Sequence, residues 1–198
     1  AADEVGGMFV SVDVANEAQV EALYARTVET FGAVDIAFNN AGISPPEDDS
    51  ILETGLDAWQ RVQQVNLTSV YLCCKHVIPH MQRQGKGSII NTASFVAVMG
   101  AATSQISYTA SKGGVAALTL PAARGLARHG IRVVAIAPGI DGSGVPRLVV
   151  SAPGYTIGQA VEWFQETVAA ELPPKQEQIV EFHIVEFCFV VDLQHGMP

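Results

Sequence analysis

Short apolar segments alternate with longer amphipathic segments along most of this sequence, and no other feature constrains the fold as strongly. Asn16 is a potential helix N-cap, apolar side chains follow it at helical spacing, and Gly32 is placed to end the helix. The sequence likewise predicts strands at Gly7–Val14, Val34–Asn39, Ser88–Thr92 and Ile131–Ala137, and helices at Leu56–Met81, in two pieces, and Tyr108–His129. Strands that are apolar on both faces indicate a parallel sheet with helices on both sides. The predicted class is the doubly wound, Rossmann-like α/β fold.

The 198 residues fit a single domain, because no linker or internal repeat divides them. The alternating pattern weakens after Asp141, where closely spaced glycines and prolines predict a long irregular segment. We expect residues 141–172 to form a substrate-loop region that includes a helix over Ile157–Leu172. A last strand is expected at Phe187–Asp192.

Composition and charge exclude several classes of function. The net charge of −9, without a cluster of basic residues, argues against binding to nucleic acid. The apolar runs are shorter than a membrane span, and the N-terminus lacks the pattern of a signal peptide. Three cysteines without CxxC spacing favour reduced thiols and a cytoplasmic location. His76 and His80 have a spacing that can hold zinc, but no third ligand is evident, so we predict no metal site.

Polar or glycine-bearing turns follow three of the predicted strands. Asn39–Gly42 (NNAG) follows one strand, Ser94 follows the next, and Pro138-Gly139 follows another. The carboxyl ends of parallel strands meet at one edge of an open α/β sheet, which is where such sheets bind ligands. Each turn alone is an ordinary strand-to-helix connection, but together they predict a ligand site.

Tyr108 and Lys112 stand four residues apart on a predicted helix and therefore lie on one face. A phenol has a pKa of about 10, and a nearby ammonium group lowers that value by stabilising the phenolate. Such a pair is suited to general acid/base catalysis, although the same spacing also occurs in solvated pairs on surface helices.

These motifs together resemble the short-chain dehydrogenase/reductase family. NNAG at Asn39–Gly42, Ser94, YxxxK at Tyr108–Lys112 and the PG at Pro138-Gly139 occur in the family's order and at its usual intervals. Asn66 matches the asparagine of the family's catalytic tetrad. Asp13-Val14 matches the acidic-apolar pair that lies against the adenine. The resemblance extends from about Gly7 to Gly139.

The resemblance implies specific roles and a nicotinamide cofactor, NAD or NADP. Tyr108 would exchange the substrate proton, Lys112 would lower the pKa of the tyrosine, and Ser94 would hold the substrate oxygen. Asn66 would open a helix kink and anchor a proton-relaying water. The residues implied to contact the cofactor are Asp13, Val14, Asn40, Ala41, Gly42, Tyr108, Lys112, Pro138, Gly139 and Ser143, the last being the hydroxyl nearest to the family's usual threonine.

The sequence also departs from the family pattern. It starts where the third family strand is expected, so the first two strands and the glycine-rich TGxxxGxG turn that cradles the pyrophosphate are not in it. We therefore expect an N-terminally incomplete chain, in which the choice between NAD and NADP cannot be read. Since the family strand order is 3-2-1-4-5-6-7, Gly7–Val14 should not pair with Val34–Asn39.

The resulting hypothesis is an NAD(P)-dependent oxidoreductase that interconverts a secondary alcohol and a ketone, both small molecules. The alternative is a non-catalytic fragment or interaction module that keeps the fold but cannot bind a dinucleotide. Segments of the sequence resemble both type-2 3-hydroxyacyl-CoA dehydrogenases and oxoacyl reductases, so the substrate stays open. The family's usual helix packing implies a homodimer or homotetramer through about Asn66–Gln84 and Tyr108–His129.

Overall fold

The computed structural model describes residues 6–99, 104–140 and 146–151. Its centre is a sheet of four strands in the order β1-β2-β3-β4. The strands are β1 (Ile36–Asn39), β2 (Gly87–Thr92), β3 (Ile131–Ile140) and β4 (Pro146–Ser151). The first three run parallel, with Ala37 beside Ile89 and Ile89 beside Val133, so the predicted parallel sheet is confirmed.

The helices are α1 (Glu17–Phe31), α2 (Leu56–Gln63), α3 (Ser69–Gln84), α4 (Val96–Met99) and α5 (Ile106–Leu126). A five-residue π-helical segment, Gln64–Thr68, joins α2 to α3, and a 3₁₀ turn, Ala127–His129, follows α5. The helix predicted in two pieces over Leu56–Met81 is therefore continuous, with the π-helical turn lying between α2 and α3.

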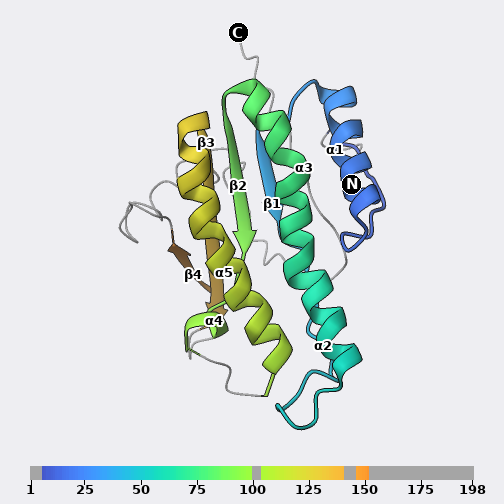
Figure 1. Ribbon diagram of the computed structural model, residues 1–198, viewed down its shortest axis with the longest axis vertical. Coiled ribbons are helices and arrows are strands. Elements are labelled where there is room, and N and C mark those ends of the chain that lie inside the picture. Colours follow the sequence, from blue (N-terminus) through green and yellow to red (C-terminus); the bar gives the residue numbers. More distant parts are fainter. Residues whose placement is uncertain (1–5, 100–103, 141–145, 152–198) are drawn as a thin grey trace.

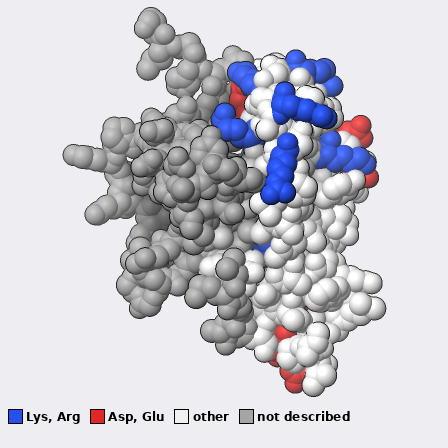
Figure 2. Space-filling view, turned by 60° about the vertical axis from the view of Figure 1, so that its left-hand side comes forward, with Lys and Arg blue, Asp and Glu red and all other residues white. Residues whose placement is uncertain are grey.

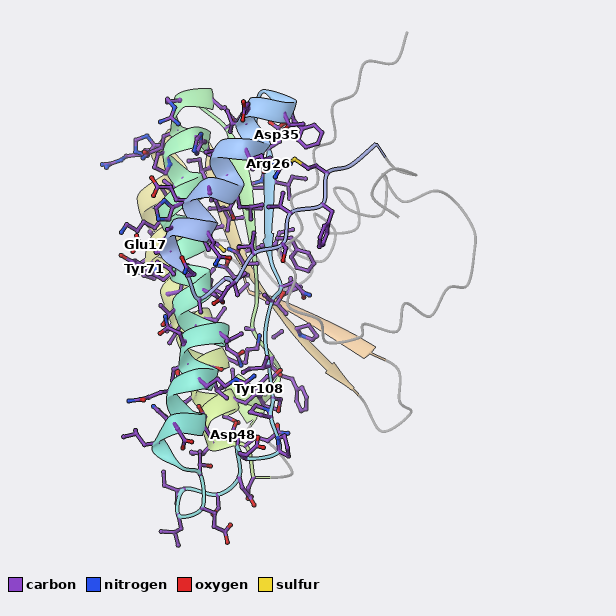
Figure 3. All side chains as sticks on the ribbon, turned by 90° about the vertical axis from the view of Figure 1, so that its right-hand side faces the viewer. Glu17, Arg26, Asp35, Asp48, Tyr71 and Tyr108 are labelled. Atoms are coloured by element: carbon purple, nitrogen blue, oxygen red, sulfur yellow. The ribbon has the colours of Figure 1, made fainter. Side chains whose placement is uncertain are left out.

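The long helices α1, α3 and α5 lie on one face of the sheet (Figures 1 and 3). The predicted α/β class with a parallel sheet is confirmed, and all the long helices that the structure describes cover this one face. The reason is topological: β1, β2 and β3 step across the sheet in one direction, and right-handed crossovers then place every connecting helix on the same side.

The main core lies between this helical layer and the sheet. Side chains alternate across a strand, so Ile89 of β2 and Val133 of β3 face the helices. They pack in one cluster with Val77 of α3 and Val115 of α5, both fully buried. On the other face Ile90, Val134 and Ile136 are also buried, as expected for strands apolar on both sides.

The segment Gly7–Val14 does not form the predicted strand. Residues 7–13 have no regular secondary structure, and Val14 lies in a turn before α1. The segment does not pair with β1, in agreement with the family strand order. A β-conformation is held by hydrogen bonds to a neighbouring strand, and without such a neighbour the apolar residues of this segment serve packing instead, as Val12 does against the core.

The prediction of a long irregular segment after Asp141 is partly wrong. Residues 146–151 form β4, which pairs antiparallel with the end of β3, Ala135 opposite Ser151 and Ile140 opposite Pro146. The remaining expectations for the tail, Ile157–Leu172 and Phe187–Asp192, lie outside the described residues.

Basic side chains gather at one end of the described surface (Figure 2). Arg83 is in the last turn of α3, Arg124 is in the last turn of α5, and Arg128 follows in the 3₁₀ turn. Positive charge at helix C-termini interacts favourably with the helix dipole. In the part of the chain that the structure describes, no helix combines the length and apolarity needed to cross a membrane.

Candidate active site

The turn after β1 is held by the side chain of Asn66, which is fully buried in the π-helical segment. Its Nδ2 donates to the Ile43 carbonyl at 2.8 Å, and its Oδ1 accepts from the Ile43 N–H at 2.7 Å. Nδ2 also contacts Ser111 Oγ at 3.2 Å, one residue before Lys112. A π-helical turn in an otherwise α-helical rod often marks a functional site, and here it directs Asn66 between two other elements.

Lys112 is a buried cation at the carboxyl edge of the sheet. Only 4% of it is exposed, and its Nζ donates to the carbonyl oxygen of Thr92, the last residue of β2, at 2.7 Å. Burial lowers the pKa of Lys112 to about 8, because desolvation disfavours the charged form. The ammonium group therefore titrates within reach of neutral pH.

Gly42 completes this cluster. A Cβ atom at Gly42 would lie 3.4 Å from Asn66 Oδ1 and 3.5 Å from Lys112 Nζ. The turn, the π-helical segment and helix α5 therefore converge within van der Waals contact. A hydrogen atom in place of a side chain leaves the backbone open to close approach by a ligand.

Tyr108 lies one turn before Lys112 in α5. Lys112 Nζ is 5.7 Å from the centre of the Tyr108 ring, a distance at which a cation and an aromatic face attract each other. The Tyr108 backbone N–H donates to Asp48 Oδ2 at 2.7 Å. The YxxxK spacing thus brings phenol and ammonium together as expected.

Ser94 lies just beyond the end of β2 and is buried. Its Oγ accepts a long hydrogen bond, 3.5 Å, from the Val96 N–H, and among the described residues no hydrogen bond joins it to Tyr108. The backbone around Ser94 is fixed by the end of β3: the Ala93 N–H donates to Ile136 O at 2.8 Å, and the Phe95 N–H donates to Pro138 O at 3.0 Å.

A polar network supports the same edge from inside the core. Asn39 Nδ2 donates to Asn91 Oδ1 at 2.8 Å, and Asn91 Nδ2 donates to Thr119 Oγ1 at 3.0 Å, which ties β1, β2 and α5 together. On the adjoining turn Thr92 Oγ1 donates to Asn40 Oδ1 at 3.2 Å. Buried hydrogen bonds of this kind fix the relative positions of the elements that carry the site.

The other expected cofactor residues contribute less to this cluster. Asp13 forms a local turn, in which its Oδ1 accepts from the Ala15 N–H at 2.9 Å, and Val14 is buried beside it. Pro138 offers its carbonyl to Phe95, and Gly139 pairs with Arg147 of β4. Ser143 lies outside the described residues. No group of three or more His, Cys, Asp or Glu side chains that could hold a metal ion occurs in the described ranges.

The sequence analysis missed Asp48. Nothing in the sequence singles out Asp48 within the acidic run Glu47-Asp48-Asp49, but in the structure it is 4% exposed. Its two carboxylate oxygens accept from the backbone N–H groups of Ser107, at 2.8 Å, and Tyr108, at 2.7 Å. No local signal marks this residue, since its partners lie about sixty positions later in the chain.

Tyr108, the buried Lys112 ammonium group, Asn66 and Gly42 thus lie together at the carboxyl edge of the sheet. Known proteins match this chain in the same region. The family model described as "Enoyl-(Acyl carrier protein) reductase" matches residues 1–142, most of the chain. The chain belongs to the short-chain dehydrogenase/reductase family.

Individual relatives carry the names of dehydrogenases and reductases. The chain is 44% identical over 132 residues to the cis-4-hydroxycyclohexanecarboxylate dehydrogenase of Sinomonas cyclohexanicum, covering 67% of this chain and 52% of that protein. It is 41% identical over 130 residues to a 3-oxoacyl-[acyl-carrier-protein] reductase of Synechocystis, covering 66% and 51%. The crystal structure of levodione reductase matches with a TM-score of 0.63 at 40% identity, covering 66% and 50%. The chain therefore spans about half the length of the relatives that it matches.

Proposed function

We propose that this chain is part of an NAD(P)-dependent oxidoreductase that interconverts a secondary alcohol and a ketone. The observation that carries the proposal is the buried Lys112 ammonium group 5.7 Å from the Tyr108 ring, in a cluster with Asn66 and Gly42. Relatives with matching sequence over this region are named as oxidoreductases, which supports a redox reaction on a small organic substrate.

The residues present fit a nicotinamide cofactor at this edge. Replacing the hydrogen of Gly42 by a methyl group would fill the space beside Lys112 Nζ and Asn66 Oδ1, so the turn admits a ligand close to its backbone. Asn40, Ala41 and Gly42 would line the cofactor. Lys112 uses one of its three donors on Thr92 O and would offer another to a cofactor hydroxyl. When bound, the cofactor supplies or accepts the hydride.

The chain's own residues would handle the proton and the substrate oxygen. Tyr108 would donate its phenolic proton in reduction and accept the proton in oxidation. The charged form of Lys112 would favour the phenolate, and its pKa of about 8 lets it exchange protons itself near neutral pH. Ser94 would donate a hydrogen bond to the substrate oxygen as negative charge develops there. Asn66 would hold the turn that carries Gly42.

The test is Tyr108→Phe, which removes the hydroxyl and keeps the ring. We expect the kcat to fall at least about 100-fold, because general acid/base catalysis contributes about that much or more. The Kd for NAD(P), measured by fluorescence or calorimetry, should change less than about threefold, because the binding turn is untouched. Tyr24→Phe on α1 is the matched control, since it removes the same group from a tyrosine outside the candidate site.

Two results would speak against the proposal. Near-normal turnover in Tyr108→Phe would refute the assigned proton transfer. Absence of dinucleotide binding by the protein with a glycine-rich TGxxxGxG turn in place would favour the alternative, a module that keeps the fold without catalysis.

We also propose that the protein is a cytoplasmic homodimer or homotetramer. Tyr71 on α3 and Leu120 on α5 are large side chains that are 54% and 41% exposed, on the two helices expected to meet a second copy. Three cysteines without CxxC spacing accord with a reducing compartment.

A further inference from the structure

The first turn of α5, which carries Tyr108, is capped from outside the helix. The first four N–H groups of a helix have no acceptor within it. Here the Ile106 N–H donates to the Asp49 carbonyl at 3.2 Å, and those of Ser107 and Tyr108 donate to the Asp48 carboxylate. The preceding residue, Gln105, makes no side-chain cap, and its carbonyl accepts from the Thr109 N–H at 2.9 Å.

Asp48 is suited to this task by burial and charge. A buried carboxylate is costly unless it is hydrogen-bonded, and both of its oxygens accept backbone N–H groups at short distances. The positive end of the helix dipole also favours a negative charge there. Figure 3 shows Asp48 directly beside Tyr108. Glu47 and Asp49, by contrast, are exposed.

The loop that carries Asp48 is itself held at both ends. On one side Asn66 binds Ile43 through two hydrogen bonds, next to the turn of Gly42. On the other side Thr54 Oγ1 accepts from the Asp49 N–H at 2.8 Å, and the Asp48 N–H donates to Pro45 O at 3.0 Å. The same short loop therefore links the turn that would line the cofactor to the backbone of Tyr108.

Helix α2 adds a second support at the same point. Gln63 Nε2 donates to the Ser107 carbonyl at 2.9 Å, and Ser107 Oγ donates to the Trp59 carbonyl at 3.1 Å. These contacts hold Ser107, but they leave the Tyr108 N–H to Asp48 alone among the described residues. Asp48 is thus the direct backbone anchor of Tyr108.

We propose that Asp48 is a positioning residue that fixes the first turn of α5, and with it the Tyr108 phenol, relative to the turn at Gly42. This inference rests on the proposed function, in which Tyr108 transfers the proton. Asp48 touches neither phenol nor ammonium group; it acts through the backbone of Tyr108.

The experiment compares Asp48→Asn with Asp49→Asn, which removes the same charge from the neighbouring, exposed acid. In Asp48→Asn the amide group presents a donor where an acceptor is needed. We expect the kcat to fall about 10- to 100-fold, because small misplacements of a reacting group cost rates of that order. The KM and Kd for NAD(P) should stay within about threefold, and Asp49→Asn should behave like the parent.

Hydrogen exchange of the backbone amides reports on the same anchor without reference to activity. The amides of Ser107 and Tyr108 should exchange at least about ten times faster in Asp48→Asn, while that of Val115 in the middle of α5 should be unchanged. If the parent chain has no activity, the proposed function fails but this measurement still decides the role of Asp48. Unchanged exchange at Ser107 and Tyr108 would overturn the proposal.

Gln84→Ala serves as a control that distinguishes a general loss of stability from a specific effect on the position of Tyr108. Gln84 makes two hydrogen bonds to the backbone of Val34, two residues before β1 and away from the site. This variant loses stability with the candidate site intact. If an active parent loses no more kcat through Asp48→Asn than through Gln84→Ala, Asp48 has a structural role only and the proposal is wrong.

Discussion

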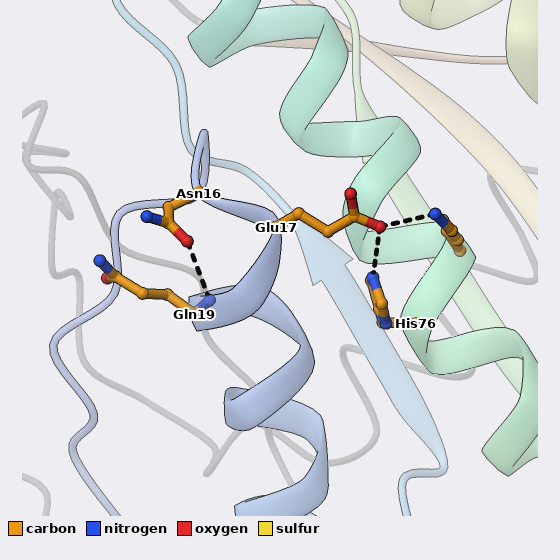
Figure 4. Close-up of polar contacts among 5 residues, drawn as sticks. Asn16, Glu17, Gln19 and His76 are labelled. Carbon is orange, nitrogen blue, oxygen red and sulfur yellow. Dashed lines mark hydrogen bonds and ion pairs between the residues drawn. The ribbon is translucent and has the colours of Figure 1, made fainter.

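Helices α1 and α5 begin in opposite ways. The first turn of α1 is capped by the residue that precedes it: Asn16 Oδ1 accepts from the Gln19 N–H at 3.2 Å (Figure 4). The first turn of α5 depends on Asp48 and Asp49, which lie almost sixty residues earlier in the chain. A local cap satisfies N–H groups within its own segment, whereas a cap from a distant segment also holds the helix in a set position relative to that segment. The second arrangement is found where the candidate chemistry is.

The difference extends to the interior of the two helices. The buried residues of α1 are Val20, Leu23, Tyr24 and Thr27, none of which carries a charge. Helix α5 buries Lys112, whose lowered pKa shows that its charged form is destabilised in the folded protein. Functional sites often contain such buried ionisable groups, which lower the free energy of unfolding but are needed for the reaction.

The largest effect that we expect from this contrast is a gain of stability in Lys112→Met. The folded protein releases the Lys112 proton near pH 8, whereas the unfolded chain holds it up to about pH 10.5. The cost of burying the charge is therefore fully present below pH 8 and disappears as the pH rises towards 10.5. Replacing the buried ammonium group by an apolar side chain should raise the free energy of unfolding at pH 7 by at most about 3 kcal/mol. The loss of the hydrogen bond from Lys112 to the Thr92 carbonyl reduces this gain.

Urea denaturation at pH 7 and at pH 10 measures this effect. The advantage of Lys112→Met over the parent should shrink at the higher pH. The variant should also lose activity, if the proposed function is right. An advantage of equal size at both pH values would show that Lys112 carries no burial cost.

A smaller effect is expected from Asn16→Ala at the start of α1. Loss of an N-cap side chain typically costs about 1 kcal/mol. Because this cap serves only its own helix, faster amide exchange should be confined to the first turn of α1, at Gln19. Any change in the exchange of Ser107 or Tyr108 would contradict the view that α1 is capped independently of the site. Thermal unfolding and exchange together make the measurement.

The smallest effect is expected from Glu17→Gln. Glu17 Oε1 accepts from Lys75 Nζ at 2.6 Å and lies 3.1 Å from His76 Nε2, both on α3 (Figure 4). The hydrogen bond from Lys75 and then that from His76 lower the pKa of Glu17, so any stabilisation is present above the ordinary carboxyl range and lost as the pH falls through the lowered value. Exposed ion pairs contribute little, and the Tm at pH 7 should change by no more than about 2 °C. A larger shift in calorimetry would show that this contact between α1 and α3 is more than a surface pair.

The sequence predicted the features that depend on neighbouring residues and missed those that depend on distant contacts. Both ends of α1 were predicted because their causes are local, Asn16 at one end and Gly32, with a positive φ of 84°, at the other. Strands β2 and β3 were predicted because an apolar, β-branched run is enough when neighbouring strands are present. The segment Gly7–Val14 is also apolar and β-branched, but it pairs with no strand among the described residues, and composition alone cannot form a strand.

The candidate site shows the division again. Tyr108, Lys112 and Asn66 were found because they stand at fixed spacings within recognisable motifs. Asp48 was not predicted because its role depends on a contact between its loop and the backbone of α5, sixty positions away, and no sequence motif indicates that contact. Strand β4 was not predicted for the same reason, since among the described residues it pairs with the distant end of β3 alone.

The π-helical turn at Gln64–Thr68 also determines which side of α3 faces inward relative to α2. Val62 and Met81 are both fully buried, although they are nineteen residues apart. In an uninterrupted α-helix of 3.6 residues per turn, that separation would point them about 100° apart. The π-helical turn absorbs one residue, and about eighteen residues make five complete turns, so both side chains face inward. Deleting one residue within 64–68 would leave these two side chains eighteen residues apart, so a regular helix would keep both facing inward but would lose the wide turn that carries Asn66.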